Sequence, residues 1–125
     1  MAAAELKREW FFTPRAEWIS WQDPDTGKFK GFRVILLEEK RFLEWSEQHG
    51  IAAGASDDGE KPGRAKMSAV LEVRPGMEAE VVARVRALVE DVRRDPPRLH
   101  GVKIELPEEL LAFIADVVSG FRPPA

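Results

Sequence analysis

The chain has 125 residues, a formal net charge of -3 and no cysteine. This length suits one domain with a modest core, and the lack of cysteine excludes disulfides, cysteine nucleophiles and thiolate metal sites. No apolar run approaches the ~20 residues that span a bilayer, and the charged N-terminus lacks the apolar segment of a signal peptide. We therefore expect a single soluble, cytoplasmic domain over residues 1–125 that does not bind membranes.

The N-terminal part of the chain predicts a short helix and then a β-hairpin. Residues 2–9 are good helix formers and are expected to form a helical arm that cannot continue past Pro14. Residues 16–22 and 28–37 are expected to be strands, because the turn residues 23–27, DPDTG, separate two stretches rich in aromatic and branched side chains. Both faces of this hairpin carry rings and polar groups, so the pattern does not indicate which rings are exposed.

The middle of the chain predicts a helix followed by a loop. Phe42, Trp45 and His49 have helical spacing, so residues 38–49 are expected to form a helix, with His49 favourably placed at its C-terminal end. Residues 50–66 are rich in glycine, alanine and charged side chains. We expect them to form a long, partly mobile loop of the kind that is functional or disordered.

The C-terminal half predicts two strands that alternate with two helices. Residues 67–74 are expected to form a third strand and residues 99–105 a short fourth strand. An apolar stripe predicts an amphipathic helix over residues 77–94, and a favourable start at Pro107 predicts a last helix over residues 107–119. The fold class is therefore α+β, with an antiparallel sheet of about four strands packed with three to four helices.

The last predicted helix is apolar around about half of its circumference. Two explanations remain open: the helix contributes to a homodimer, or it lies centrally and is covered on both sides. The apolar residues are Leu110, Leu111, Phe113, Ile114, Val117 and Val118.

The sequence contains no recognisable catalytic constellation. His49 and His100 are far apart and lack a metal-binding spacing, and no phosphate-binding loop, dinucleotide-binding glycine motif or nucleophile elbow is present. We expect no catalytic residue, no metal site and no cofactor. An enzyme built from scattered carboxylates remains the third-ranked interpretation.

Residues 10–37 hold three of the four tryptophans and interleave rings with cations. This pattern suits a protein that holds a single nucleic-acid strand, because bases stack on rings while cations contact phosphates. It is also typical of an ordinary buried hairpin with one wet side. If residues 28–33 lie beside residues 64–74, the cations of both segments line one edge or cleft. The predicted binding residues are Arg15, Trp18, Trp21, Lys28, Phe29, Lys30, Phe32, Arg33, Arg64, Lys66 and Arg74.

The order of these elements resembles the ThermoDBP-related proteins of hyperthermophilic archaea. The best stretch covers residues 8–45, REWFFTPRAEWISWQDPDTGKFKGFRVILLEEKRFLEW. The resemblance implies a four-stranded antiparallel sheet packed with helices, a cleft for single-stranded nucleic acid without strong sequence preference, and dimers or higher oligomers. The absence of asparagine and the 33% of charged residues favour a heat-adapted source or, equally, a GC-rich genome.

These observations predict a non-enzymatic protein that binds single-stranded DNA, with RNA as a second candidate ligand. The alternative is a structural or protein-interaction module that uses the aromatic hairpin and the C-terminal helix against another protein.

Overall fold

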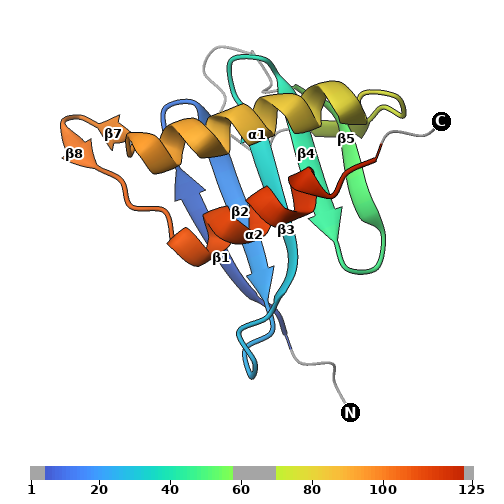
Figure 1. The fold of residues 1–125 in the computed structure, drawn as a ribbon, viewed down its shortest axis with the longest axis horizontal. Coiled ribbons are helices and arrows are strands. Elements are labelled where there is room, and N and C mark those ends of the chain that lie inside the picture. The colour runs from blue at the N-terminus through green and yellow to red at the C-terminus, as the bar shows by residue number, and fades with distance from the viewer. Residues whose placement is uncertain (1–4, 58–69, 123–125) are drawn as a thin grey trace.

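Six consecutive strands form an antiparallel sheet in which each strand pairs with the next one along the chain (Figure 1). The structure, a computed structural model, describes residues 5–57 and 70–122. Within these ranges it confirms the α+β class and the antiparallel sheet, and it corrects the number of elements to six sheet strands and two helices. The strands are β1 (Lys7–Phe12), β2 (Ala16–Gln22), β3 (Phe29–Leu36), β4 (Arg41–Ser46), β5 (Gly50–Asp57) and β6 (Val70–Val73).

The predicted hairpin is confirmed as β2 and β3, which pair from Ala16 with Leu36 to Gln22 with Phe29. Asp23 organises the turn: its carboxylate accepts a hydrogen bond from the Asp25 amide at 2.8 Å, and its carbonyl accepts one from the Gly27 amide, also at 2.8 Å. Gly27 has a φ of 74°, which glycine adopts without steric cost. Local turn chemistry therefore fixes the register of the two strands.

Two segments that were expected to be helical are strands. Residues 7–9 begin β1, whose residues pair with β2 from Lys7 to Phe12; residues 2–4 of the predicted arm lie outside the described residues. Residues 41–46 form β4, which pairs with β3 on one side and β5 on the other. Helix propensity differs little among ordinary residues, so pairing with two neighbouring strands overrides it. His49 therefore lies in the turn between β4 and β5, and no helix end is present there for it to stabilise.

The predicted loop over residues 50–66 is wrong for residues 50–57, which form β5; residues 58–66 lie outside the described residues. Neighbouring atoms leave little room for side chains in β5, which explains its glycines and alanines. Ala53 is fully buried, and a Cβ on Gly54 would lie only 1.9 Å from the carbonyl oxygen of Glu72 in β6. Small residues here allow tight packing of a strand.

Two helices, α1 (Glu78–Arg94) and α2 (Glu108–Ser119), lie side by side across one face of the sheet (Figure 1). Both agree with the predicted helices to within one residue at each end. The Arg86 guanidinium donates a hydrogen bond of 2.8 Å to the Val118 carbonyl, and Arg93 forms an ion pair with Glu108. These contacts fix the two helices against each other.

The core lies between the helices and the sheet. Trp18, Phe32 and Leu43 come from the sheet and are fully buried there. The valines of α1 meet them, as does α2 through Leu110 and Ile114. Burial of this apolar surface stabilises the fold at roughly 25 cal/mol per Å².

The predicted strand over residues 99–105 is not one continuous strand. Arg98–Leu99 (β7) and Val102–Lys103 (β8) pair as a short hairpin, and residues 104–105 have no regular structure. His100 and Gly101 form the turn with φ values of 52° and 78°, as in a two-residue turn with both residues left-handed. The third predicted strand is confirmed as β6 over residues 70–73, and residues 67–69 lie outside the described part.

The broad apolar face of α2 is largely covered within one chain. Leu110, Leu111, Ile114 and Val118 are buried, and Phe113 packs against the same core. Packing within one chain therefore buries most of this apolar face, and homodimer formation stays a prediction. Neither helix in the described ranges is long and apolar enough to cross a membrane.

Candidate nucleic-acid interface

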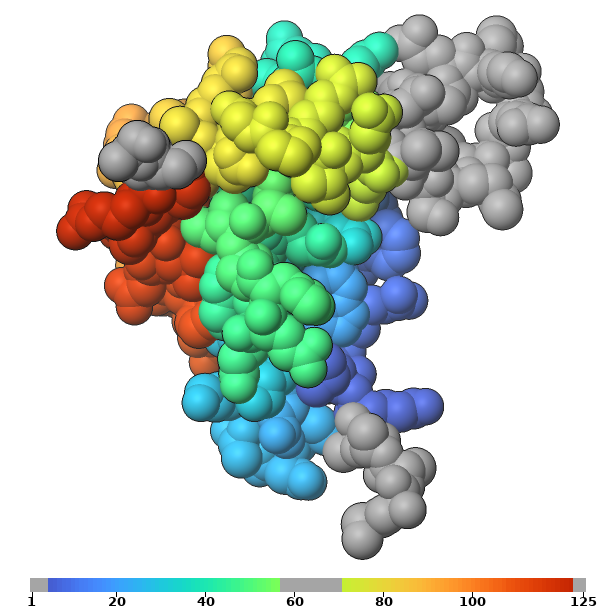
Figure 2. All heavy atoms as spheres, turned by 90° about the vertical axis from the view of Figure 1, so that its right-hand side faces the viewer, coloured from blue at the N-terminus to red at the C-terminus, as the bar shows by residue number. Residues whose placement is uncertain are grey.

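The sheet face opposite the helices displays rings and cations from several strands. The strand register defines this face: Trp10 pairs with Ile19, Ile19 with Arg33, and Arg33 with Glu44. Residues that pair across neighbouring strands point to the same side of a sheet. Figure 2 shows α2, in red, on one side of the molecule, while residues of β1, in blue, appear on the other. We call this surface the open face and define it by residues Arg8, Trp10, Phe12, Glu17, Trp21, Arg33 and Glu44.

The edge strand β1 contributes two exposed rings to the open face. Trp10 is 44% exposed and Phe12 is 55% exposed, and the two rings stack with centroids 5.3 Å apart. The Arg8 guanidinium lies 5.7 Å from the Trp10 ring centroid, within cation–π range. Among the described residues, no carboxylate forms an ion pair with Arg8. The indole Nε1 of Trp10 donates to Glu17 at 3.2 Å, which orients the ring.

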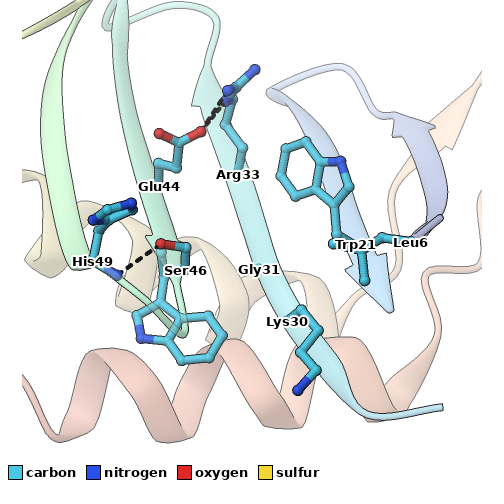
Figure 3. A pocket seen from close by; sticks show the side chains of 9 residues that line it. Leu6, Trp21, Lys30, Gly31, Arg33, Glu44, Ser46 and His49 are labelled. Carbon is cyan, nitrogen blue, oxygen red and sulfur yellow. Dashed lines mark hydrogen bonds and ion pairs between the residues drawn. The ribbon is translucent and has the colours of Figure 1, made fainter. Parts of the chain in front are cut away.

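A shallow pocket of about 310 Å³ lies on the open face between β2, β3 and β4. Figure 3 shows Trp21 on one side of Gly31, with Glu44, Ser46 and His49 on the other side. A Cβ on Gly31 would lie 3.5 Å from Cε3 of Trp21 and 3.0 Å from the Trp45 carbonyl oxygen. The glycine therefore keeps the floor of the pocket open beside the indole ring.

Arg33 links the two sides of this pocket. Its Nε and Nη2 donate to Oε1 of Glu44 at 2.9 and 2.5 Å, and its guanidinium lies 5.4 Å from the Trp21 ring centroid. Both side chains of the ion pair are about 30% exposed. The pair thus holds a cation and a carboxylate in fixed positions next to an aromatic wall.

Lys30 lies at the lower edge of the pocket in Figure 3. Its Nζ donates to Oε2 of Glu47 at 3.0 Å. This hydrogen bond and the charge of Lys30 lower the pKa of Glu47 below its ordinary value, with a smaller contribution from Lys28. Both lysines therefore lie close enough to Glu47 to stabilise its charged form.

Three of the four predicted stacking rings lie on the helix side of the sheet. Trp18 and Phe32 have no exposed surface, and the Trp18 Nε1 donates to Thr13 Oγ1 at 3.0 Å. Phe29 packs against Phe113 with ring centroids 5.0 Å apart. The structure thus corrects the assignment of these rings to a binding surface: Trp18 and Phe32 belong to the core, Phe29 packs against it, and of the four only Trp21 lies on the open face.

The predicted cations divide into three groups by location. Lys28, Lys30 and Arg33 lie around the β2–β3 end and the pocket. Arg15 instead forms an ion pair of 3.2 Å with Asp91 of α1, and Arg74 pairs with Glu72 at 3.5 Å. Neither of the last two lines the pocket. Arg64 and Lys66 lie outside the described residues.

Sequence reasoning missed Arg8, Trp10 and Phe12, which the structure places together on β1. The signal was present in KREWFF as a period-2 alternation of Arg8, Trp10 and Phe12, which is typical of one face of a strand. Assigning the preceding residues to a helix concealed this alternation.

Comparison of the chain with models of protein families, with curated proteins and with solved structures gave no match in any of the three. The function proposed below therefore depends on the geometry of the open face alone.

Proposed function

We propose that the open face binds single-stranded DNA, with RNA as a second ligand, largely without regard to sequence. The single observation that carries the proposal is the cluster of exposed Trp10 and Phe12 with Arg8, next to the Trp21 and Arg33 pair, on the sheet face that neither α1 nor α2 covers. Rings accept unpaired bases, and the adjacent cations attract phosphates.

The positions of the side chains support a path for a strand across β1, β2 and β3. Arg8 pairs in register with Trp21, and Trp21 with Gly31. Neighbouring strands lie about 4.8 Å apart, so ring and cation are within reach of adjacent nucleotides. A duplex presents no free base faces to these rings, because its bases are already stacked. We therefore expect duplex DNA to bind much more weakly than single strands.

The acidic net charge does not oppose this proposal, because many of the acids lie on the helices. Glu78 and Glu80 begin α1, and Glu108 and Glu109 begin α2. These helices cover the other face of the sheet (Figure 1). On the open face, Glu17 accepts a hydrogen bond from Trp10, and Glu44 accepts one from Arg33. The local charge near the rings is thus more favourable to phosphate than the total charge of -3.

A fluorescence anisotropy titration with labelled single-stranded and duplex oligonucleotides tests the proposal. Phe12→Ala should weaken single-strand binding by about 1–3 kcal/mol, the range measured for stacked bases. Val102→Ala is the matched control, because Val102 is 66% exposed in the β7–β8 hairpin, away from the open face. Equal weakening by both variants would contradict the stacking mechanism, and so would equal affinity for duplex and single strand.

A protein-interaction module is the second candidate function, and one observation favours it. Among the described strands, β1 pairs only with β2, so its other edge has no partner strand there, and the side chains of Leu6, Trp10 and Phe12 are exposed beside it. Such edges recruit a strand from a partner unless charge or cover prevents it. A folded protein that binds no single strand even at low salt would favour this candidate over nucleic-acid binding.

A further inference from the structure

The pocket beside Trp21 has the size and shape for one flat ring system. Its volume of about 310 Å³ is at the lower end of the range for ligand pockets. The Trp21 indole supplies an apolar wall, Gly31 an open floor, and Glu44 and Ser46 a polar edge on the far side (Figure 3). A base that enters from the open face would lie over Gly31 with one edge toward Glu44.

We propose that this pocket holds one base of the bound strand and prefers guanine at that position. The inference rests on the proposed function and adds a base preference at one site to binding that is otherwise independent of sequence. The preference follows from the chemistry of the polar edge, as the hydrogen bonds around Glu44 indicate.

Glu44 presents a fixed carboxylate with unused acceptor capacity. Its Oε1 accepts both hydrogen bonds from Arg33, while its Oε2 has no hydrogen-bond partner in the described part of the chain. An ionised carboxylate only accepts hydrogen bonds and can accept several. Arg33 therefore holds the group in place without saturating it.

Guanine matches this acceptor better than the other bases. Its Watson–Crick edge offers two adjacent donors, the N1–H and the 2-amino group, which can both donate to the unused Oε2 of Glu44. Adenine and cytosine place a ring nitrogen acceptor beside their amino group, and thymine and uracil flank one N–H with two carbonyls. These acceptors would face the negative Glu44 carboxylate, which disfavours the other bases.

The hydroxyl of Ser46 adds a second polar group at the same edge. Its Oγ accepts a hydrogen bond of 3.1 Å from the His49 amide, so its own O–H is available to donate. A hydroxyl donor next to the carboxylate suits the guanine O6 acceptor that lies next to N1–H. The pocket edge thus offers acceptors and a donor in the order that guanine requires.

The test compares three oligothymidine strands that differ at one central position: thymidine, deoxyguanosine or deoxyinosine, which lacks the 2-amino group. Anisotropy titrations should show about tenfold tighter binding of the deoxyguanosine strand than of the other two, because only guanine places two donors at Oε2; this is the lower end of the discrimination that specific base contacts give. Glu44→Gln should abolish this preference, so that the three strands bind this variant with equal affinity. Glu17→Gln, which removes the other acid of the open face, should retain it.

Equal affinity of the wild-type protein for deoxyguanosine and deoxyinosine strands would overturn the guanine pocket, and this comparison requires no variant. A preference that survives in Glu44→Gln would also overturn it. In both cases, binding of the all-thymidine strand would leave the proposed function intact. Failure of every strand to bind would overturn the proposed function and the guanine pocket with it.

Discussion

At the scale of single residues, the open face is built from pairs in which one side chain positions another. Glu17 orients the Trp10 indole, and Glu44 holds Arg33 beside Trp21. Exposed ion pairs contribute little to stability, typically about 0–1 kcal/mol. The main structural effect of these acids is therefore to position a ring and a cation on the open face.

The Lys30–Glu47 pair gives a prediction that can be measured at one residue. Because Lys30 lowers the pKa of Glu47 from its ordinary value of 4.5, Lys30→Ala should raise this pKa in an NMR titration of the Glu47 carboxyl. A lowered carboxyl pKa stabilises the fold above the pKa of the unfolded chain, and the contribution is lost as the pH falls through the folded value. Since both side chains are substantially exposed, the effect on stability should be small.

Lys28→Ala is the control for this titration, because Lys28 acts on Glu47 only through its charge and contributes least. It should raise the pKa of Glu47 less than Lys30→Ala does. A larger effect from Lys28, or an unchanged pKa in Lys30→Ala, would show that the hydrogen bond between Lys30 and Glu47 does not form in solution.

At the scale of elements, the sequence predicted those helices and strands whose local sequence pattern matches the side that is buried in the fold. The β2–β3 hairpin has its turn residues 23–27, and α1 and α2 have apolar stripes that match their buried sides. In β4, Phe42 and Trp45 point to opposite faces of the sheet, so their helical spacing is coincidental. The period-2 alternation of β4 becomes apparent only from its pairing with β3 and β5.

For the candidate site, the sequence predicted the types of residue involved but not which of them are exposed. Trp18 and Trp21 lie on the same strand at odd spacing, so one faces the core and the other the open face. Which of them is buried depends on the side that α1 and α2 cover, and that side is set by long-range packing. Strand alternation shows that the two rings face opposite sides of the sheet, but it does not show which side is exposed.

Gly54 provides a prediction about how β5 and β6 fit together. A Cβ at this position would lie 1.9 Å from the Glu72 carbonyl oxygen and 2.9 Å from the Arg74 amide nitrogen. Because backbone must move to accept it, Gly54→Ala should lower the free energy of unfolding by about 1–3 kcal/mol in urea denaturation.

Gly120→Ala is the matched control for that substitution. A Cβ there meets no atom closer than 3.6 Å, and the φ of -84° is accessible to alanine. This variant should be neutral or slightly more stable, by up to about 1 kcal/mol, because alanine reduces the freedom of the unfolded chain. Equal stability of the two variants would mean that β6 does not approach Gly54 as closely as described.

At the scale of the whole molecule, the helices and the open face divide the surface into two parts with different charge. The acid-rich starts of α1 and α2 lie on the covered face, whereas Arg8 and Arg33 lie on the open face among rings. The total charge of -3 therefore does not describe the open face, where Arg8 and Arg33 balance Glu17 and Glu44. The affinity for a ligand with many phosphates should therefore depend on the position of each cation as well as on the net charge of the protein.

Arg8→Ala and Arg94→Ala test this idea, because they change the net charge by the same amount on different faces. Arg94 ends α1 and is 73% exposed, while Arg8 adjoins the exposed Trp10 ring. For a single strand, the logarithm of affinity should fall with the logarithm of salt concentration by about 0.7 per neutralised phosphate. Arg8→Ala should make this slope shallower by roughly one such contact, and Arg94→Ala should leave it nearly unchanged. Equal slopes in both variants would show that the strand does not contact Arg8, and the proposed path across β1 would be wrong.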